Sequence, residues 1–399
     1  MPEGPHRPRR GAATIEEVAR AAGVSRQTVS NTLNAPQRVR PETLERVNAA
    51  IRELGYQPDQ SARSLRSGAR RTIGYLAPVD DPLDPNPLMA GFLEALVDAA
   101  GAAGQRVLLF RPGQGTADPA AAIDELVAAR QVDGLVLADV LHEDVRIAHA
   151  ARLGVPFVSF GRTGPGQPQH WVDIGNEAAM AEVVRHLAAL GHRRIGYLGA
   201  AEELPWMAAR RAGFLAEADR LGLSAVATGV DRAGAVDGAG GEAEGSVTAS
   251  VRALLRGPDR PTAVAAGSDL LALDVYEAVR AEGLVIGPGG VAVTGFHDTP
   301  LCRHLHPGLT SVRLPLRAIA TALVGRLLDQ VRGRAAPGEG LELPTELVVR
   351  GSSGRSGGAE RSGWSGWFGE PGRSGEPGRS GRSGRSGEPG RSGRSGRSG

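Results

Sequence analysis

Near the N-terminus, apolar residues recur at helical spacing in short segments that are separated by capping residues. Thr14 and Glu17 form the T-x-x-E pattern of a capping box, which predicts that a helix begins here. Gly23 ends this helix, and Ser25 is suited to cap a second one that runs to about Leu33. The pattern therefore predicts two short helices joined by a tight turn.

A third helix is predicted directly after these two. Pro41 stands in its first turn, where its missing N–H is tolerated, and Gly55 ends it. Between them, apolar residues follow one another three or four positions apart, at Leu44, Val47, Ile51 and Leu54. Residues 13–57 are therefore expected to form a small helical head.

From residue 72 onward, short β-branched or Leu-rich runs alternate with Ala-rich amphipathic segments. The expected strands are 72–77, 106–110, 134–138, 156–160, 194–198, 262–266 and 291–295. The expected helices include 88–103, 119–129, 176–190, 207–221, 269–282 and 316–332. This alternation is typical of parallel sheets that are covered on both faces. A core at 71–350 is too long for one small doubly wound domain, so we expect two lobes.

The composition changes at the ends of the chain and between the head and the core. Residues 1–12 are rich in Pro, Arg and Gly, and residues 351–399 repeat Gly-Arg-Ser and Gly-Glu-Pro. Both segments are predicted to be disordered because they offer almost nothing to bury. Residues 58–70 are expected to form a hinge or linker.

The charges are unevenly distributed, although the whole chain carries only +2. Residues 1–71 carry a net +6 and residues 351–399 a net +5, which leaves −9 for residues 72–350. A basic head on an acidic body suits a head that binds a polyanion.

The cellular compartment follows from what the sequence lacks. Cys302 is the only cysteine, which excludes an intrachain disulfide and indicates a reducing compartment. The N-terminus has no apolar signal segment, and no apolar run reaches the roughly 18 residues of a membrane span. We therefore expect a cytoplasmic protein with no membrane partner.

The second predicted helix carries residue types that read DNA. In a helix-turn-helix, the N-terminal part of the second helix enters the major groove. Arg26, Gln27 and Asn31 lie opposite its apolar side, and such side chains pair with guanine or adenine edges. Ser25 and Thr28 are better placed for phosphate contacts. A capped bundle with a solvated polar face has the same spacing, so both interpretations stay open here.

A longer stretch of sequence favours the DNA-binding interpretation. The residues that carry it are 14–34, 39–43 and 54–58. They are similar to the head of the lac-repressor family. The resemblance implies a helix-turn-helix that binds double-stranded operator DNA, with Thr14 among the contacting residues, and places the protein at the nucleoid.

Residues 59–68 resemble the hinge of this family. In relatives the hinge becomes helical on the operator, within a dimer, and inserts a Leu into the minor groove. Leu65 falls at that position, with Ala62 one turn before it. An apolar wedge opens a base step and bends the duplex, at a cost of a few kcal/mol that added contacts offset. The alternative is a Leu that packs on the core.

The core resembles the effector domain of the family, which is similar to periplasmic sugar-binding proteins. The matching stretches are 72–76, 132–136, 190–199 and 308–313. The implied fold class is an α-helical helix-turn-helix head plus an α/β two-lobed, periplasmic-binding-protein-like (type I) effector domain. Two lobes joined by three crossings would close on a small-molecule effector in the cleft between them.

Five residues of the core fall on positions that the resemblance links to the effector. Arg210 matches an Arg that usually binds the effector's oxygens, the alternative being an exposed helix Arg. Ser268 and Asp269 fall where relatives often have Asn-Asp, and His297 and Asp298 where they often have Asp-Asp. Asp269 and Asp298 have a structural alternative, as helix caps.

The core also departs from the family pattern. His297 replaces a carboxylate that often meets the ligand, and Ser268 shortens an amide. The loop 233–245 is Gly-rich where relatives often place an aromatic residue, and the loop 80–87 is unusually rich in Pro. These departures suggest an acidic sugar or another anionic metabolite, held by Arg210 and His297.

No motif of an enzyme is present. The first strand is not followed by G-x-G-x-x-G, and the chain has no Walker A loop, no H-E-x-x-H and no Cys/His metal spacing. We therefore expect no catalytic residue, no cofactor and no metal. A secreted binding protein is excluded by the absent signal and by residues 14–68.

The expected function is sequence-specific regulation of transcription, with repression as its output. A homodimer joined through the cores would bind a pseudo-palindromic operator, under allosteric control by a sugar or sugar derivative. The alternative is a ligand-dependent activator or co-repressor-type regulator that senses a purine, a nucleoside or another anionic metabolite. The tail lacks the apolar heptads of tetrameric relatives, so a dimer is expected.

Overall fold

The computed structural model describes residues 13–56, 70–77, 87–111, 118–164, 166–167, 169–200, 204–230, 247–256, 259–334, 338 and 340–353. Several predictions lie outside these residues: those for residues 1–12, for the hinge with Ala62 and Leu65, for the loops 80–86 and 233–245, and for the tail beyond residue 353.

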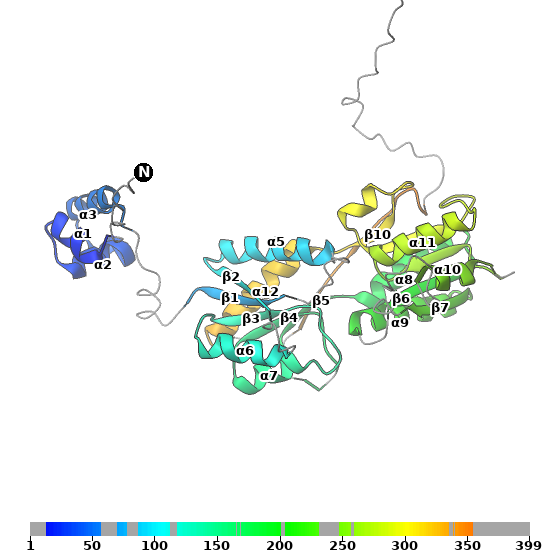
Figure 1. The fold of residues 1–399 in the computed structure, drawn as a ribbon, viewed down its shortest axis with the longest axis horizontal. Helices are drawn as coiled ribbons and strands as arrows, with labels where there is room; N and C mark the ends of the chain where they lie inside the picture. Colours follow the sequence, from blue (N-terminus) through cyan, green and yellow to red (C-terminus); the bar gives the residue numbers. More distant parts are fainter. Residues whose placement is uncertain are drawn as a thin grey trace, which may run out of the picture. The chain divides into compact units, whose positions relative to one another are not determined.

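The described part of the head consists of three α-helices and one short 3-10 helix (Figure 1). They are α1 (Ile15–Ala21), α2 (Arg26–Asn34), η1 (Pro36–Arg38) and α3 (Pro41–Leu54). The capping box is present, because Glu17 N–H donates to Thr14 Oγ1 at 3.2 Å and Thr14 N–H donates to Glu17 Oε2 at 2.7 Å. Gly55 ends α3 with a φ of 61°, in the left-handed region that suits glycine. The predicted starts and stops of these helices are confirmed.

One valine from each α-helix forms the centre of the head. Val18, Val29 and Val47 have no exposed surface and pack in one cluster. Leu54 was expected on the same apolar face, but 39% of its surface is exposed. Because Val29 lies in this cluster, the apolar face of α2 packs against the other helices, and its polar face is left to solvent.

The first lobe is built on a six-stranded sheet in the order β11-β5-β4-β3-β1-β2, with all neighbours parallel. Its strands are β1 (Thr72–Leu76), β2 (Arg106–Phe110), β3 (Gly134–Leu137), β4 (Phe157–Phe160), β5 (Trp171–Ile174) and β11 (Gly340–Leu343). The helices α5 (Pro87–Ala102) and α12 (Leu316–Val331) cover one face, and α6 (Pro119–Ala128) and α7 (Val145–Leu153) cover the other (Figure 1).

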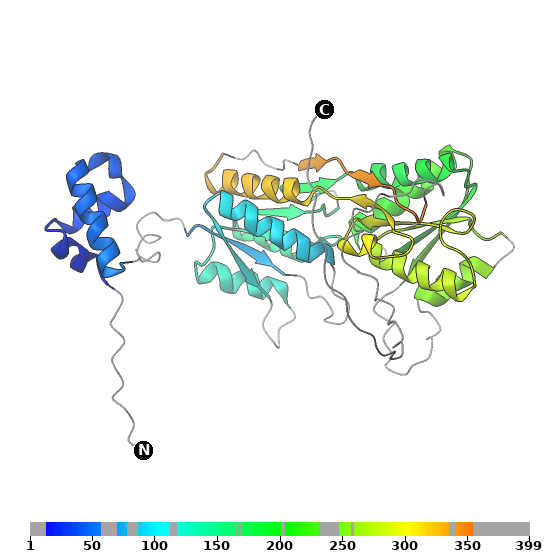
Figure 2. The same ribbon diagram turned by 90° about the horizontal axis from the view of Figure 1, so that it is seen from above.

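The second lobe has a sheet in the order β12-β10-β9-β8-β6-β7. Its strands are β6 (Arg194–Ala200), β7 (Ser224–Val230), β8 (Ala263–Ala266), β9 (Ala292–His297), β10 (Thr310–Arg313) and β12 (Glu346–Val348), of which only β12 runs antiparallel to its neighbour. The helices α8 (Asn176–Ala189) and α9 (Pro205–Arg220) lie on one face, and α10 (Val247–Arg256) and α11 (Asp269–Ala281) lie on the other (Figure 2). A short 3-10 helix, η2 (Pro300–Arg303), follows β9.

The chain passes between the two lobes three times. It leaves β5 of the first lobe for α8 of the second, returns from β10 to α12, and crosses again between β11 and β12. Two lobes with three crossings agree with the predicted fold class. The sequence pattern did not predict β5, β7, β10, β11, β12, α7 or α10.

Candidate functional site

The start of α2 is fixed by two residues that were predicted to contact DNA phosphates. Ser25 is the N-cap, and its Oγ accepts the N–H of Thr28 at 3.1 Å. The two hydroxyl groups of Ser25 and Thr28 also lie 3.0 Å apart, within hydrogen-bond distance. Thr14 has the same capping role at the start of α1. Each of these residues therefore has a structural task besides the predicted contact with DNA.

The predicted base-reading residues lie together on the polar side of α2. Gln27 Nε2 donates to Asn31 Oδ1 at 3.0 Å, one turn along the helix. Arg26 forms an ion pair with Glu16 of α1 at 3.4 Å, and the two side chains are 63% and 67% exposed. Such exposed pairs contribute little to stability, so DNA can replace these partners at small cost.

A small cavity between the two lobes, here called the inner chamber, contains two of the predicted effector residues. The first lobe contributes Met89, Asp139 and Phe160, and the second lobe contributes Trp206, Arg210 and His297. Asp173 and Asn176, on either side of the first crossing, complete its polar wall. The chamber therefore touches both lobes and one of the segments that join them.

Arg210 is the central polar group of this wall, although it is only 3% exposed. Its Nε donates to Asn176 Oδ1 at 2.9 Å, and one terminal nitrogen donates to Gly267 O at 2.7 Å and to His297 Nε2 at 3.0 Å. No carboxylate among the described residues accepts a hydrogen bond from it. Burial lowers the pKa of Arg210 to about 9, so the guanidinium is still charged at neutral pH.

Aromatic rings and close helix packing hold Arg210 in place. Its guanidinium carbon lies 4.5 Å from the ring centroid of Trp206 and 3.6 Å from that of Phe296. Gly213, one turn further along α9, allows this helix to approach α8, because a Cβ there would overlap the backbone of Glu177. The guanidinium is therefore fixed before any ligand arrives.

His297 is neutral in this arrangement. Its Nε2 accepts the hydrogen bond from Arg210, which requires the ring proton on Nδ1. Burial, together with the charge of Arg210, holds the pKa of His297 well below its ordinary value. His297 consequently adds no positive charge to the chamber.

Two acidic residues of the chamber, Asp139 and Asp173, were missed by the sequence analysis. Asp173 Oδ1 accepts the N–H of Ile174 at 2.8 Å, and its Oδ2 accepts Arg162 Nε at 3.1 Å. Burial raises the pKa of Asp173. Both acids stand at the carboxyl ends of parallel strands, where open α/β sheets bind ligands, and that placement was the available signal.

The other three predicted effector residues do not line the inner chamber. Ser268 caps α11 by accepting the N–H of Leu271 at 3.2 Å. Asp269 accepts hydrogen bonds from Ser311 Oγ at 2.6 Å and from Thr299 N–H at 2.7 Å. Burial raises the pKa of Asp269. A direct contact of Ser268 or Asp269 with an effector stays a prediction without support from this geometry.

Asp298 also has partners inside the protein. It forms ion pairs with Arg313 at 2.7 Å and with Arg350 at 2.6 Å, and its side chain is 2% exposed. The structural alternative describes Asp269 and Asp298 better than the effector contact does, although the helix cap at this place is Ser268.

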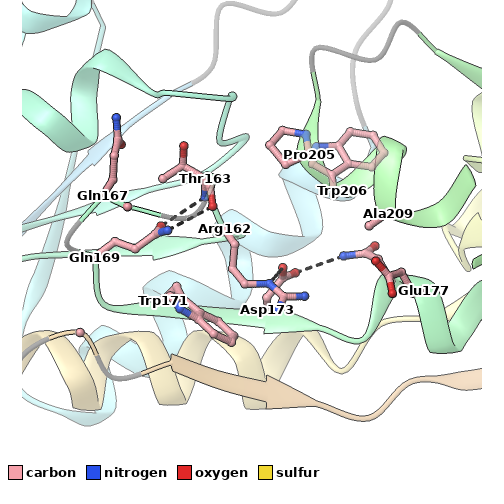
Figure 3. A pocket seen from close by; sticks show the side chains of 14 residues that line it. Arg162, Thr163, Gln167, Gln169, Trp171, Asp173, Glu177, Pro205, Trp206 and Ala209 are labelled. Carbon is pink, nitrogen blue, oxygen red and sulfur yellow. Dashed lines mark hydrogen bonds and ion pairs between the residues drawn. The ribbon is translucent and has the colours of Figure 1, made fainter. Parts of the chain in front are cut away.

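A larger cavity, here called the outer chamber, adjoins the inner one and has a volume of about 490 Å³. The two share Asp173, Asn176 and Trp206. Figure 3 shows Arg162 and Gln169 on one side of it and Trp206 on the other. The outer chamber thus continues the inner one along the junction of the lobes.

Two kinds of feature are absent from the described residues. No helix among them is long and apolar enough to cross a membrane. No group of three or more His, Cys, Asp or Glu side chains among them is arranged to hold a metal ion. The expected absence of a cofactor stays a prediction.

The sequence matches two known families. Residues 14–59 match the bacterial regulatory proteins of the lacI family, and residues 184–353 match the periplasmic binding protein-like domain. The first match covers the described head, and the second covers most of the second lobe. Both agree with the architecture described above.

Individual relatives extend this match over most of the chain. The transcriptional regulator CelR of Thermobifida fusca is 31% identical over 348 residues, which cover 86% of this chain and 99% of the relative. A structure of the lac repressor dimer bound to operator and the anti-inducer ONPF is 26% identical, with a TM-score of 0.71 and coverage of 86% and 99%. A CelR–cellobiose complex is 28% identical, with a TM-score of 0.62 and coverage of 85% and 99%. This chain belongs to the lacI family of bacterial regulatory proteins and is a DNA-binding regulator of transcription with an effector-binding domain.

Proposed function

We propose that the protein is a repressor that binds a pseudo-palindromic operator as a homodimer, one head per half-site, and that a small molecule controls it. The observation that carries this proposal is the inner chamber, where polar groups of both lobes converge in a chain that also has a helix-turn-helix. The operator-bound lac repressor dimer supports the assembly. Repression follows because a bulky dimer on a promoter blocks the polymerase. The protein would act in the cytoplasm, at the nucleoid.

Control by the effector would arise from the two lobes. A ligand in the inner chamber contacts groups from both, and it stabilises the arrangement of the lobes in which those groups suit it best. The change of lobe orientation passes to the hinge, where Leu65 enters the minor groove in the DNA-bound form, with Ala62 one turn before it. Effector and operator binding are then coupled, and each changes the affinity for the other by the same factor.

The head would read DNA with the exposed groups of α2. Arg26, Gln27 and Asn31 contact base edges, whereas Thr14, Ser25 and Thr28 contact phosphates. The exposed pairings of Arg26 and Gln27 support these roles, because both side chains exchange partners at little cost. Operator affinity should fall steeply with salt, since Arg–phosphate contacts release counterions.

The effector we propose is a sugar or a sugar derivative. The inner chamber offers Arg210 as a donor, Asp139 and Asp173 as acceptors, and the ring of Trp206 as an apolar wall. Hydroxyl groups both donate and accept, so they match this mixed set. An anionic metabolite suits it less well, because Asp139 and Asp173 line the same chamber as Arg210 and His297 is neutral. The relative crystallised with cellobiose supports the sugar class.

A ligand-dependent activator or co-repressor-type regulator that senses a purine or nucleoside is the second candidate. The observation that favours it is the pair of rings on opposite lobes, Phe160 and Trp206, which would suit a flat base. The two candidates differ in the ligand and in the sign of its effect on DNA binding.

The test is a selection of binding sites from random DNA with the full chain, followed by ligand titration of the selected site. We expect the selected site to be pseudo-palindromic and sedimentation to show one dimer bound per site. We also expect a sugar to release the DNA. Tighter DNA binding in the presence of a nucleoside or purine would support the second candidate. Absence of any sequence preference would contradict both.

A further inference from the structure

The inner chamber is too small to hold a whole sugar. Its free volume is about 50 Å³, against about 490 Å³ for the outer chamber. A single water needs about 10–15 Å³ of such volume, so the inner chamber accommodates only a few water-sized groups in this lobe arrangement. The outer chamber, in contrast, has the size of a typical small-molecule site. A ligand that reaches Arg210 therefore extends into the outer chamber.

The walls of the outer chamber suit a ring with hydroxyl groups. It is lined by two tryptophans, Trp171 from β5 and Trp206 from α9. Arg162 lies over the ring of Trp171, with its guanidinium carbon 4.8 Å from the ring centroid, and pairs with Glu342 at 3.5 Å. Figure 3 shows Trp171 and Trp206 in different parts of the wall, with Arg162 between them. Apolar rings with polar groups among them are the usual composition of such a site.

One polar atom of this wall has no partner. Gln167 Oε1 is buried and has no hydrogen-bond partner among the described residues. Gln169 differs, because its amide accepts the N–H of Thr163 at 3.3 Å and donates to Thr163 O at 3.4 Å. A buried acceptor without a donor costs free energy, and a ligand hydroxyl would supply the donor.

We propose that the outer chamber is a second saccharide subsite, so that the effector is a disaccharide or a longer glycoside. Hydroxyl groups of its terminal ring reach Arg210 in the inner chamber, and the next ring lies in the outer chamber, against the tryptophans and the free acceptor of Gln167. This inference rests on the proposed sugar effector, and it adds the number of rings that the site recognises.

Ala209 allows the subsite to be blocked without a change in the inner chamber. It lies on α9, one turn after Trp206, and lines the outer chamber but not the inner one (Figure 3). Ala209→Trp fills part of the outer chamber, and Ala209→Leu does so to a smaller extent. Ala216→Trp is the matched control, because Ala216 is an exposed residue of the same helix.

The experiment is calorimetric titration of the full chain with cellobiose, maltose, lactose, melibiose and trehalose, and with glucose and galactose. We expect one disaccharide to bind at least about tenfold more tightly than its own monosaccharides, which corresponds to about 1.4 kcal/mol. Ala209→Trp should remove this advantage and Ala209→Leu should reduce it, whereas Ala216→Trp should keep it. Thermal denaturation of each variant verifies that it is folded.

Two outcomes would overturn the subsite. One is that no disaccharide of the panel binds more tightly than its own monosaccharides, whether both bind or neither does. The other is a folded Ala209→Trp that binds the preferred disaccharide as the unchanged protein does. In either case the proposed regulator would still stand if a monosaccharide or a nucleoside released the selected operator. Failure of the subsite and failure of the proposed function are therefore distinguishable.

Discussion

The polar face of α2 and the wall of the inner chamber both present an arginine, but under opposite conditions. Arg26 is 63% exposed and holds one equally exposed carboxylate at 3.4 Å. Arg210 is 3% exposed, donates to three acceptors and lies against two aromatic rings. The first is free to exchange partners, whereas the second is held in one geometry.

This difference fits two kinds of recognition. DNA is bound by many contacts, each of which replaces water and a weak internal partner. The binding free energy is therefore the sum of many small contributions. A small ligand offers few atoms, so its site gains from groups that are already in position and need no ordering. Substitutions in the buried network should therefore have a large effect on one property, either core stability or effector affinity. Substitutions on α2 should have smaller effects on operator affinity.

The largest effect is expected behind the chamber, at Asp298. Asp298→Ala leaves the buried guanidinium of Arg350 without its carboxylate, with only Leu309 O as acceptor among the described residues, and it should lower the free energy of unfolding of the core by about 3–5 kcal/mol. Urea denaturation followed by near-UV circular dichroism measures this. Glu346→Ala is the control, because Glu346 pairs with Arg313 from a side chain that is 67% exposed, and its removal should cost less than about 1 kcal/mol. If folded Asp298→Ala lost its effector affinity, the effector contact would be the better interpretation.

Arg210→Ala should weaken effector binding by at least about 100-fold, since one or more charge-assisted hydrogen bonds at roughly 1.5–3 kcal/mol each are lost. Operator binding without effector should persist, because Arg210 contacts only the core. Titration calorimetry and operator anisotropy measure the two properties. Arg220→Ala, at the 60% exposed end of α9, is the control. An effector response that survives Arg210→Ala would place the site elsewhere.

On α2, Arg26→Ala and Gln27→Ala should each reduce operator affinity by about 1–3 kcal/mol and relax the preference for one base pair. Glu16→Ala sharpens the comparison, because it removes the internal partner of Arg26 and should leave operator binding equal or slightly tighter. Fluorescence anisotropy with the selected operator and with single-base variants measures both. Weaker operator binding by Glu16→Ala would mean that the pair positions Arg26 for DNA.

The head was predictable because its signals are local. The capping box spans four residues, and the left-handed turn of Gly55 depends on that residue and its neighbours. The apolar spacing also gave the buried valines of the three helices. The short helix η1 was missed, since three residues carry no periodicity.

The core was predictable where a strand forms an apolar run, as β2, β3 and β8 do. The strands β11 and β12 lie at the edges of their sheets and contain only exposed and half-buried residues, and neither forms an apolar run. The helix α7 buries Arg146 and His149, and a pattern based on apolar residues does not find such a helix. These elements are fixed by their neighbours in space and not by their own composition.

The chamber was the least predictable part, since it is assembled from distant segments. Arg210 and His297 were found through the family resemblance, yet their mutual hydrogen bond changes what they imply, because it makes His297 a neutral acceptor. Asp139 and Asp173 come from different strands of the first lobe, and only the strand order brings them to one cavity. Trp206 joins them through the packing of α9 on α8.

The smallest effect is expected from acid at the capping box, where the groups are exposed as on α2. Hydrogen bonds from the N–H and hydroxyl of Thr14 lower the pKa of Glu17 below its ordinary 4.5. Because the pKa is lower in the folded helix, the contribution of Glu17 is fully present above pH 4.5 and is lost as the pH falls through the lowered value. Hydrogen exchange of the peptide that contains α1, in the full chain, should therefore show protection that declines with acid more in the unchanged protein than in Glu17→Gln. Glu53→Gln, at an exposed position of α3, corrects for other effects of acid and should behave as the unchanged protein does. Equal acid sensitivity of the Glu17→Gln variant and the unchanged protein would mean that the capping box contributes nothing measurable to the stability of α1. The caps of the head would then be as replaceable as the ion pair of Arg26.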